Sequence, residues 1–394
     1  MSVESSDINN HFGDTEKPGF FEKIGIALFF QLARKNRTAK LNFENLTDEE
    51  MLRKTRKITV SSGIIAFAIG GISAWGSVAT ELLFPETACE VFISFSCMEK
   101  YGWVMGVTLF LTVIEFAVLI WVSIYAVYHI SIITGHNRSI NEDNITNQIP
   151  NLLSRAALEI PDPVRHVLGI DPYRNVSKKK LLFFGMLYKL KVVLSNVLAK
   201  LILRRVFGKS ILRVGAEFIS VPITGLWNAL VIFKVSREAR LRLFGNLLAR
   251  HIAENEITDE KLKELSETAR LCCLQALGNS IVLTQNYHPN MIILILRLIE
   301  VFNHKNNERL DSWDEFLQNC SQLKAKERNF VMDLLSIAAA FDGKISRLEK
   351  EKLGEVFLEY TDIYYRRIKR LKHLMLSGRL NEAIRECALD FEPG

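Results

Sequence analysis

The sequence predicts an all-α protein built from a two-span transmembrane helical hairpin, a basic helix on the membrane surface and a C-terminal helical bundle. Two long apolar runs follow each other in the N-terminal third, and a strongly basic segment comes after them. The remaining chain has the apolar periodicity of amphipathic helices and no convincing strand run. A length of 394 residues leaves room for two or three domains.

These patterns divide the chain into five parts. Residues 1–57 form a cytoplasmic segment with a short interfacial or packed helix, and residues 58–133 form the hairpin, with spans at about 58–80 and 104–127. Residues 134–177 are a cytoplasmic linker, residues 178–235 a basic amphipathic helix followed by kinked membrane-associated helices, and residues 236–394 a cytoplasmic helical domain.

The first span, from Ile58 to Thr80, contains no charged residue and is long enough to cross a hydrocarbon core of about 30 Å. The second run, from Trp103 to Ile133, contains one acidic residue, Glu115, near its middle. One such run would also fit a buried core helix. Two in succession, joined by a short loop, predict a membrane hairpin.

Basic residues at the ends of the spans predict the orientation, because Lys and Arg concentrate on the cytoplasmic side. Four of them directly precede the first span: Arg53, Lys54, Arg56 and Lys57. The connecting loop, by contrast, is acidic, with Glu86, Glu90 and Glu99 against Lys100. We therefore expect a multi-pass protein of the plasma (inner) membrane with both termini in the cytoplasm.

Two features of the hairpin are candidates for more than anchoring. Glu115 would lie at bilayer depth, where a carboxylate is costly and either serves a function or bonds to a neighbouring helix such as the first span, at Ser73. Small residues at Ser62, Ala66, Gly70 and Ala74 recur every four positions, which lets another helix approach closely. The second span or a second copy of the chain would fit this stripe.

The six cysteines fall into two groups. Cys89 and Cys97 lie in the outer loop, and a disulfide between them would close the tip of the hairpin in an oxidising space. Their spacing is the only argument for it. Cys272, Cys273, Cys320 and Cys387 fit no zinc pattern, and we expect them to be small apolar core residues.

The charged residues between Val164 and Ala216 are all basic except Asp171. A helix from Lys178 to Phe207 would have one uncharged face, which is typical of a helix on an anionic leaflet. The residues that would contact lipid head groups are Lys178, Lys179, Lys180, Arg204 and Arg205. Nucleic acid is not expected as a partner, because no zinc-finger, RNP-like or helix-turn-helix signature is present.

The next apolar run, Ile211 to Phe233, contains Pro222 near its middle and has basic residues at both ends. A single crossing would break the positive-inside pattern on one side. We therefore expect a kinked hairpin that dips into the membrane or packs on it, in preference to a third crossing.

Leu334 to Leu353, LLSIAAAFDGKISRLEKEKL, resembles the signature of the tellurite-resistance TerB-like helical domains. In that family a helix of small residues ends in Asp-Gly, turns, and restarts with Ser and Glu. The resemblance implies a TerB-like bundle from about Arg240 to Cys387. It also implies Asp342 and Glu349 as candidate ligands of a divalent metal. Alternatively, Asp342 stabilises the turn and Glu349 caps the helix.

No catalytic motif is present: the chain lacks a phosphate-binding glycine loop and an HExxH zinc pair. Apart from that metal, no cofactor is expected. The sequence therefore favours a non-enzymatic scaffold or sensor that presents the TerB-like module to a protein partner at the cytoplasmic face, in an envelope- or metal-related response. Two alternatives remain open: a subunit of a transport or channel assembly that uses Glu115, and a lipid-acting enzyme at the leaflet. The oligomeric state is left undetermined.

Overall fold

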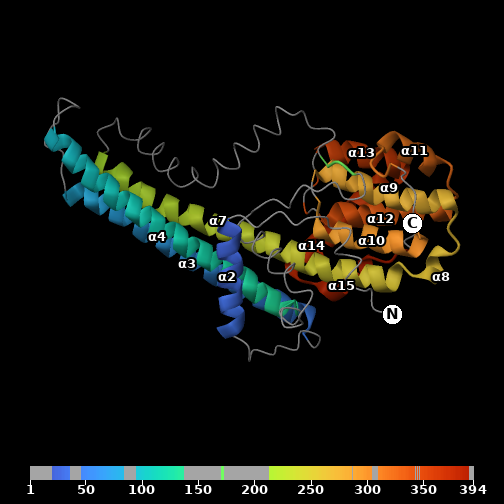
Figure 1. Cartoon of the computed structure of the whole chain (residues 1–394), viewed down its shortest axis with the longest axis horizontal. Coiled ribbons are helices and arrows are strands. Elements are labelled where there is room, and N and C mark those ends of the chain that lie inside the picture. Colours follow the sequence, from blue (N-terminus) through green and yellow to red (C-terminus); the bar gives the residue numbers. More distant parts are fainter. Residues whose placement is uncertain are drawn as a thin grey trace. The chain divides into compact units, whose positions relative to one another are not determined.

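The computed structural model describes residues 20–35, 46–83, 95–136, 170–172, 213–285, 287–303, 309–341, 343, 345 and 347–389. Within these ranges the fold is all-α, as predicted, and contains no strand (Figure 1). The long helices are α2 (Phe20–Lys35), α3 (Asp48–Leu83), α4 (Phe95–Ile133) and α7 (Arg213–His251). A π-helical turn (Ile252–Glu256) leads to α8 (Asp259–Leu262), α9 (Glu267–Thr284), α10 (Pro289–Phe302) and α11 (Trp313–Ser321). The last helices are α12 (Ala325–Phe341), α13 (Arg347–Phe357), a 3₁₀ turn (Leu358–Tyr360), α14 (Thr361–Ser377) and α15 (Leu380–Glu386).

The chain folds into two compact units. Unit 1 comprises Met1–Thr55, Tyr128–Val176 and Arg237–Gly394, and unit 2 comprises Arg56–Val127 and Ser177–Ser236. Helices α3, α4 and α7 each contribute residues to both units. Unit 1 therefore combines N-terminal segments with the C-terminal part of the chain.

Among the described residues, two helices are long and apolar enough to cross a membrane, Asp48–Thr80 in α3 and Gly106–Ile133 in α4, and most of each lies in unit 2. The buried face of α3 consists of small and hydroxyl-bearing residues at helical spacing: Thr59, Ser62, Ala66, Gly70, Ser73 and Ser77. Its large apolar side chains point outward, with Ile72 67% and Trp75 58% exposed. This arrangement is the reverse of a water-soluble helix, which buries its apolar stripe.

Helix α7 runs without interruption through Pro222, so the predicted kinked hairpin at this position is wrong. A proline removes one backbone hydrogen bond and bends a helix, but long apolar helices tolerate it where neighbouring helices pack on them. Side chains of the turns after Pro222 are buried with the regular spacing of one helix face: Thr224, Gly225, Asn228, Ala229, Ile232, Val235 and Ser236. Tertiary packing on this face favours one continuous helix.

The stripe of small residues on α3 lets α7 approach closely. A methyl group at Gly70 would lie 2.9 Å from the Thr224 carbonyl oxygen and 2.4 Å from Asn228 Nδ2, which leaves no room for it. Gly225 meets the Phe67 carbonyl oxygen in the same way, at 2.8 Å. The sequence left the partner of this stripe open between the second span and another copy of the chain. In the structure α7 covers the stripe at Gly70, and the second span, α4, packs on it at Ala66 in the cluster of Ala66, Leu119, Val122 and Ile232.

Unit 1 has the burial pattern of an ordinary helical bundle. Helix α12 is buried from Val331 to Phe341 and packs against α9 and α14. The predicted N-terminal helix is confirmed as α2, and its Phe29 packs edge-to-face on Tyr128, with ring centroids 5.3 Å apart. Thr258 caps α8, with its side-chain oxygen accepting from the Lys261 N–H. Asp48 accepts hydrogen bonds from the backbone N–H groups of Asn381 and Glu382 at the start of α15, so the N-terminal segment is bound to the C-terminal helices.

We expect Gly70→Ala to destabilise unit 2 by about 1–3 kcal/mol, because the added methyl group meets backbone as well as a side chain. Gly106→Ala is the matched control, since a methyl group there has no atom within 4 Å. Thermal unfolding of the full chain in lipid nanodiscs measures both variants. Equal melting temperatures for the two would contradict the close approach of α3 and α7.

Candidate functional site

The candidate site in unit 2 is a buried polar pair between α4 and α7. Asn228 Nδ2 donates a hydrogen bond to Glu115 Oε1 at 2.8 Å. Glu115 is 1% exposed and Asn228 is 0% exposed. The carboxylate that the sequence singled out therefore bonds to the third apolar run, which was not considered as its partner.

The pair lies where the three helices come closest. Gly70 of α3 faces Asn228, and a Cβ there would contact both Nδ2 and Cγ of the amide. The Oδ1 atom of Asn228 is buried and accepts no hydrogen bond from the residues that the structure describes. A neutral amide that donates to a carboxylate offsets part of the cost of burying the charge. The hydrogen bond is suited to hold α4 and α7 together, a role called an interhelical lock below. A carboxylate inside an apolar unit is also compatible with the transport alternative.

The candidate metal ligands receive no support from the structure. Asp342 lies outside the described residues, while Glu349 is buried in the first turn of α13 and already takes part in a polar interaction. In the part of the chain that the structure describes, no three His, Cys, Asp or Glu side chains come together as a metal site. Gly343 has a clear structural role, since its φ is +67° and a side chain there would meet Leu241 of α7 at 2.4 Å.

Several predicted residues cannot be placed. Cys89 lies outside the described residues, whereas Cys97 falls within α4. The proposed lipid-contacting residues also lie outside the described residues: Lys178, Lys179, Lys180, Arg204 and Arg205. The other four cysteines are free and buried, as expected. Burial raises the pKa of the Cys272 thiol to about 12 and that of Cys320 to about 11, so neither is a reactive thiolate at neutral pH.

Two buried histidines lie in unit 1. Burial lowers the pKa of His136 to about 4, although Asn246 Oδ1 lies 3.1 Å from Nε2 and Thr134 Oγ1 lies 2.9 Å from Nδ1. His288 caps α10 through Nδ1, and burial holds its pKa well below the usual range. Both rings are neutral at physiological pH.

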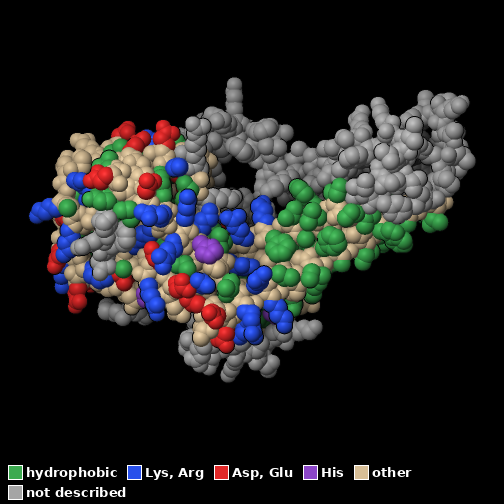
Figure 2. All heavy atoms as spheres, turned by 180° about the vertical axis from the view of Figure 1, so that it is seen from behind, with side chains coloured by type: hydrophobic (Ala, Val, Ile, Leu, Met, Phe, Trp, Pro, Cys, Tyr) green, Lys and Arg blue, Asp and Glu red, His purple; other side chains and the backbone are tan. Residues whose placement is uncertain are grey.

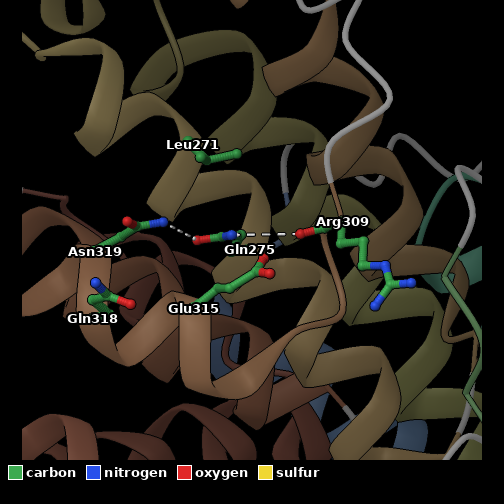
Figure 3. A pocket seen from close by; sticks show the side chains of 6 residues that line it. All are labelled: Leu271, Gln275, Arg309, Glu315, Gln318 and Asn319. Atoms are coloured by element: carbon green, nitrogen blue, oxygen red, sulfur yellow. Dashed lines mark hydrogen bonds between the residues drawn. The ribbon is translucent and has the colours of Figure 1, made fainter.

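A polar hollow of about 400 Å³ opens on unit 1 between α9, α11 and the segment before α11 (Figure 3). Gln275 is its central residue: Asn319 Nδ2 donates to Gln275 Oε1, and Gln275 Nε2 donates to the Arg309 carbonyl oxygen. Beside it, Gly278 allows the Leu310 backbone to lie directly against α9. The amides thus hold these elements together, which favours a structural role for the hollow.

One polar network escaped the sequence analysis. Arg367 of α14 forms a fully buried ion pair with Asp333 of α12, and its guanidinium also donates to the carbonyl oxygens of Glu386 and Ala388. Tyr364 donates to the same carboxylate at 3.2 Å. The signal was one polar residue within the buried face of each helix, but spacing alone could not pair residues from different helices.

Comparison of this chain with protein-family models, with curated proteins and with solved structures found no match. The resemblance to the TerB-like domains consequently stays a prediction from its short motif.

We expect Asn228→Ala to lower the free energy of unfolding by about 1 kcal/mol, because interhelical hydrogen bonds in membranes contribute about 0.6 kcal/mol on average and up to about 1.7. Glu115→Gln should change it little, since Gln retains an oxygen that accepts from Asn228. Unfolding in nanodiscs measures both. The same Glu115→Gln chain, reconstituted in vesicles, separates the two roles, because a transport role for the carboxylate requires loss of ion flux while a lock does not.

We also expect stability to fall as the pH drops from about 6.5 to about 4. Folding depresses the pKa of His136, so in this window the unfolded chain binds a proton that the folded chain does not. The full effect would be about 3 kcal/mol at the acid end, at about 1.4 kcal/mol per pKa unit. Denaturant unfolding at both pH values should show a smaller loss in His136→Gln than in the native chain. Equal pH dependence would exclude His136 as the cause.

Proposed function

We propose that this protein is a membrane-anchored scaffold or sensor that presents a helical module at the cytoplasmic face. The burial pattern of unit 2 carries this proposal. Large apolar side chains gather on the surface of α3, α4 and α7 (Figure 2). Hydroxyl, amide and carboxyl groups of these helices are buried. Leaving one such side chain in water forgoes about 1.5–3 kcal/mol. A few of them would therefore offset the whole net stability of a domain, about 5–15 kcal/mol. A lipid environment removes this cost.

Basic residues support the orientation. In unit 2, Arg56 and Lys57 at the start of the α3 apolar run and Lys234 after that of α7 are exposed. Because Phe233 of α7 lies against Gly63 of α3, the basic residues of the two helices lie at the same end of the three-helix unit. Lys and Arg at one end of an apolar belt favour the cytoplasmic side, which supports a multi-pass protein with both termini in the cytoplasm.

The presented module corresponds to the C-terminal helices of unit 1. Its core is apolar, and the buried charges of Asp333 and Arg367 are paired with each other, so it has the features of a stable helical domain. The resemblance of Leu334–Leu353 to TerB-like domains supports a role in an envelope- or metal-related response. Its partner would be another protein.

Transport is the second candidate, and the buried pair of Glu115 and Asn228 is the observation in its favour. The close packing at Gly70 weighs against it, because backbone atoms of α3 and α7 approach without space for a side chain at the level of the pair. We therefore favour anchoring by unit 2, with the pair as an interhelical lock.

We expect the native chain to stay in the membrane during alkaline carbonate extraction, and Ile72→Arg to increase the released fraction. An arginine near the centre of a span costs about 2.5–3.5 kcal/mol on insertion. Leu348→Arg is the matched control, since Leu348 is exposed on α13 of unit 1. Release of the native chain by carbonate would overturn the proposal.

Presentation of the module is tested in the same membranes. After detergent solubilisation, affinity capture of the native chain should recover a protein partner in stoichiometric amount, identified by mass spectrometry. Recovery of the chain alone from every membrane preparation would contradict the scaffold role while leaving the anchor intact.

A further inference from the structure

Helix α7 presents a third apolar face in unit 2. Ile223, Leu226, Trp227, Leu230 and Phe233 are all exposed, with exposed fractions between 38% and 55%. No charged residue occurs from Ser220 to Phe233. The opposite face of the same turns is buried against α3 and α4.

Contacts with α3 give the level of this face. Gly63 of α3 lies against Phe233, and Gly71 lies near Val221, so the two helices run antiparallel. The stretch of α7 between Val221 and Phe233 is therefore level with Gly63–Gly71. Both glycines lie within the uncharged run Ile58–Thr80, and Gly71 lies near its middle.

The polar pair gives the same level from the side of α4. Asn228 bonds to Glu115, and Ile232 packs with Leu119 and Val122 one turn further along, so α4 and α7 run parallel. Both neighbours thus place Asn228 at the mid-depth of the hairpin. If the hairpin crosses the bilayer, α7 cannot lie on its surface.

We propose that α7, from Ser220 to Phe233, is a third membrane-embedded helix, and that lipid acyl chains cover the face formed by Ile223, Leu226, Trp227, Leu230 and Phe233. This inference rests on the proposed function, because the depth of α7 follows from that of the hairpin. It replaces the surface-packed hairpin that the sequence favoured.

The edge of this face identifies lipid as its occupant in preference to a second copy of the chain. The apolar face of α7 ends at the exposed Lys234, and that of α3 ends at Arg56 and Lys57, within about two helical turns along the axis. Exposed apolar residues of α3 and α4, such as Ile72 and Phe110, continue the same belt. A shared boundary of basic side chains across separate helices is typical of a membrane interface, where Lys and Arg extend toward the head groups.

Spin labelling of the full chain tests the proposal. A nitroxide at Leu230→Cys, in vesicles of phosphatidylcholine and phosphatidylglycerol, should be accessible to oxygen, which partitions into hydrocarbon, and protected from a water-soluble nickel chelate. The background carries Cys89→Ser and Cys97→Ser. The four remaining cysteines are buried, and the unmutated positions should take up no label. Leu226→Cys provides a second site on the same face if Leu230→Cys does not fold.

Two controls make each outcome decisive. A label at Phe110→Cys on α4 reports the hairpin, and a label at Arg250→Cys, exposed near the end of α7, reports water. Oxygen access at Leu230 that matches Phe110 supports the proposal. Chelate access at Leu230, or protection from both reagents by a covering protein, overturns it while the Phe110 label still reports lipid. Chelate access at Phe110 would instead overturn the proposed membrane anchor itself.

Discussion

The approach of α3 and α7 at Gly70 is the contact on which the arrangement of unit 2 depends. Without a side chain on Gly70, the Thr224 carbonyl and the Asn228 amide lie directly against α3. That position brings Asn228 to Glu115, so the most costly side chain of the apolar region gains a hydrogen bond. Small residues on the facing surface of α3 leave its large apolar side chains, such as Ile72 and Trp75, on the outside.

The same amino-acid types are therefore sorted in opposite ways in the two units. In unit 1, Leu334, Ile337 and Phe341 of α12 are buried in an apolar core. In unit 2, Ile64 and Trp75 are exposed while Ser62 and Ser73 are buried. Burial of apolar area drives folding in water, but between helices in lipid this driving force is absent and close van der Waals packing takes its place. This contrast is the physical basis of the proposal that unit 2 lies in a membrane.

The buried polar groups of unit 1 differ from the pair in unit 2, because they include an ion pair with additional hydrogen bonds and a neutral histidine. Arg367 is held by one carboxylate and two carbonyl oxygens, which satisfies the guanidinium without solvent. His136 remains neutral because burial depresses its pKa. A buried ion pair loses much of its attraction to desolvation, so these groups specify how the helices pack more than they stabilise the fold.

The sequence by itself determined the features that depend on neighbouring residues. The helix of Phe20–Lys35, the two apolar runs and the burial of four cysteines follow from length, periodicity and side-chain chemistry. Only the tertiary structure decided that α7 continues through Pro222, that it covers the Gly70 stripe, and that Glu115 bonds to Asn228, 113 positions away. Local pattern shows that a residue needs a partner, but the partner is chosen by helix packing, which brings together residues that no spacing along the chain relates.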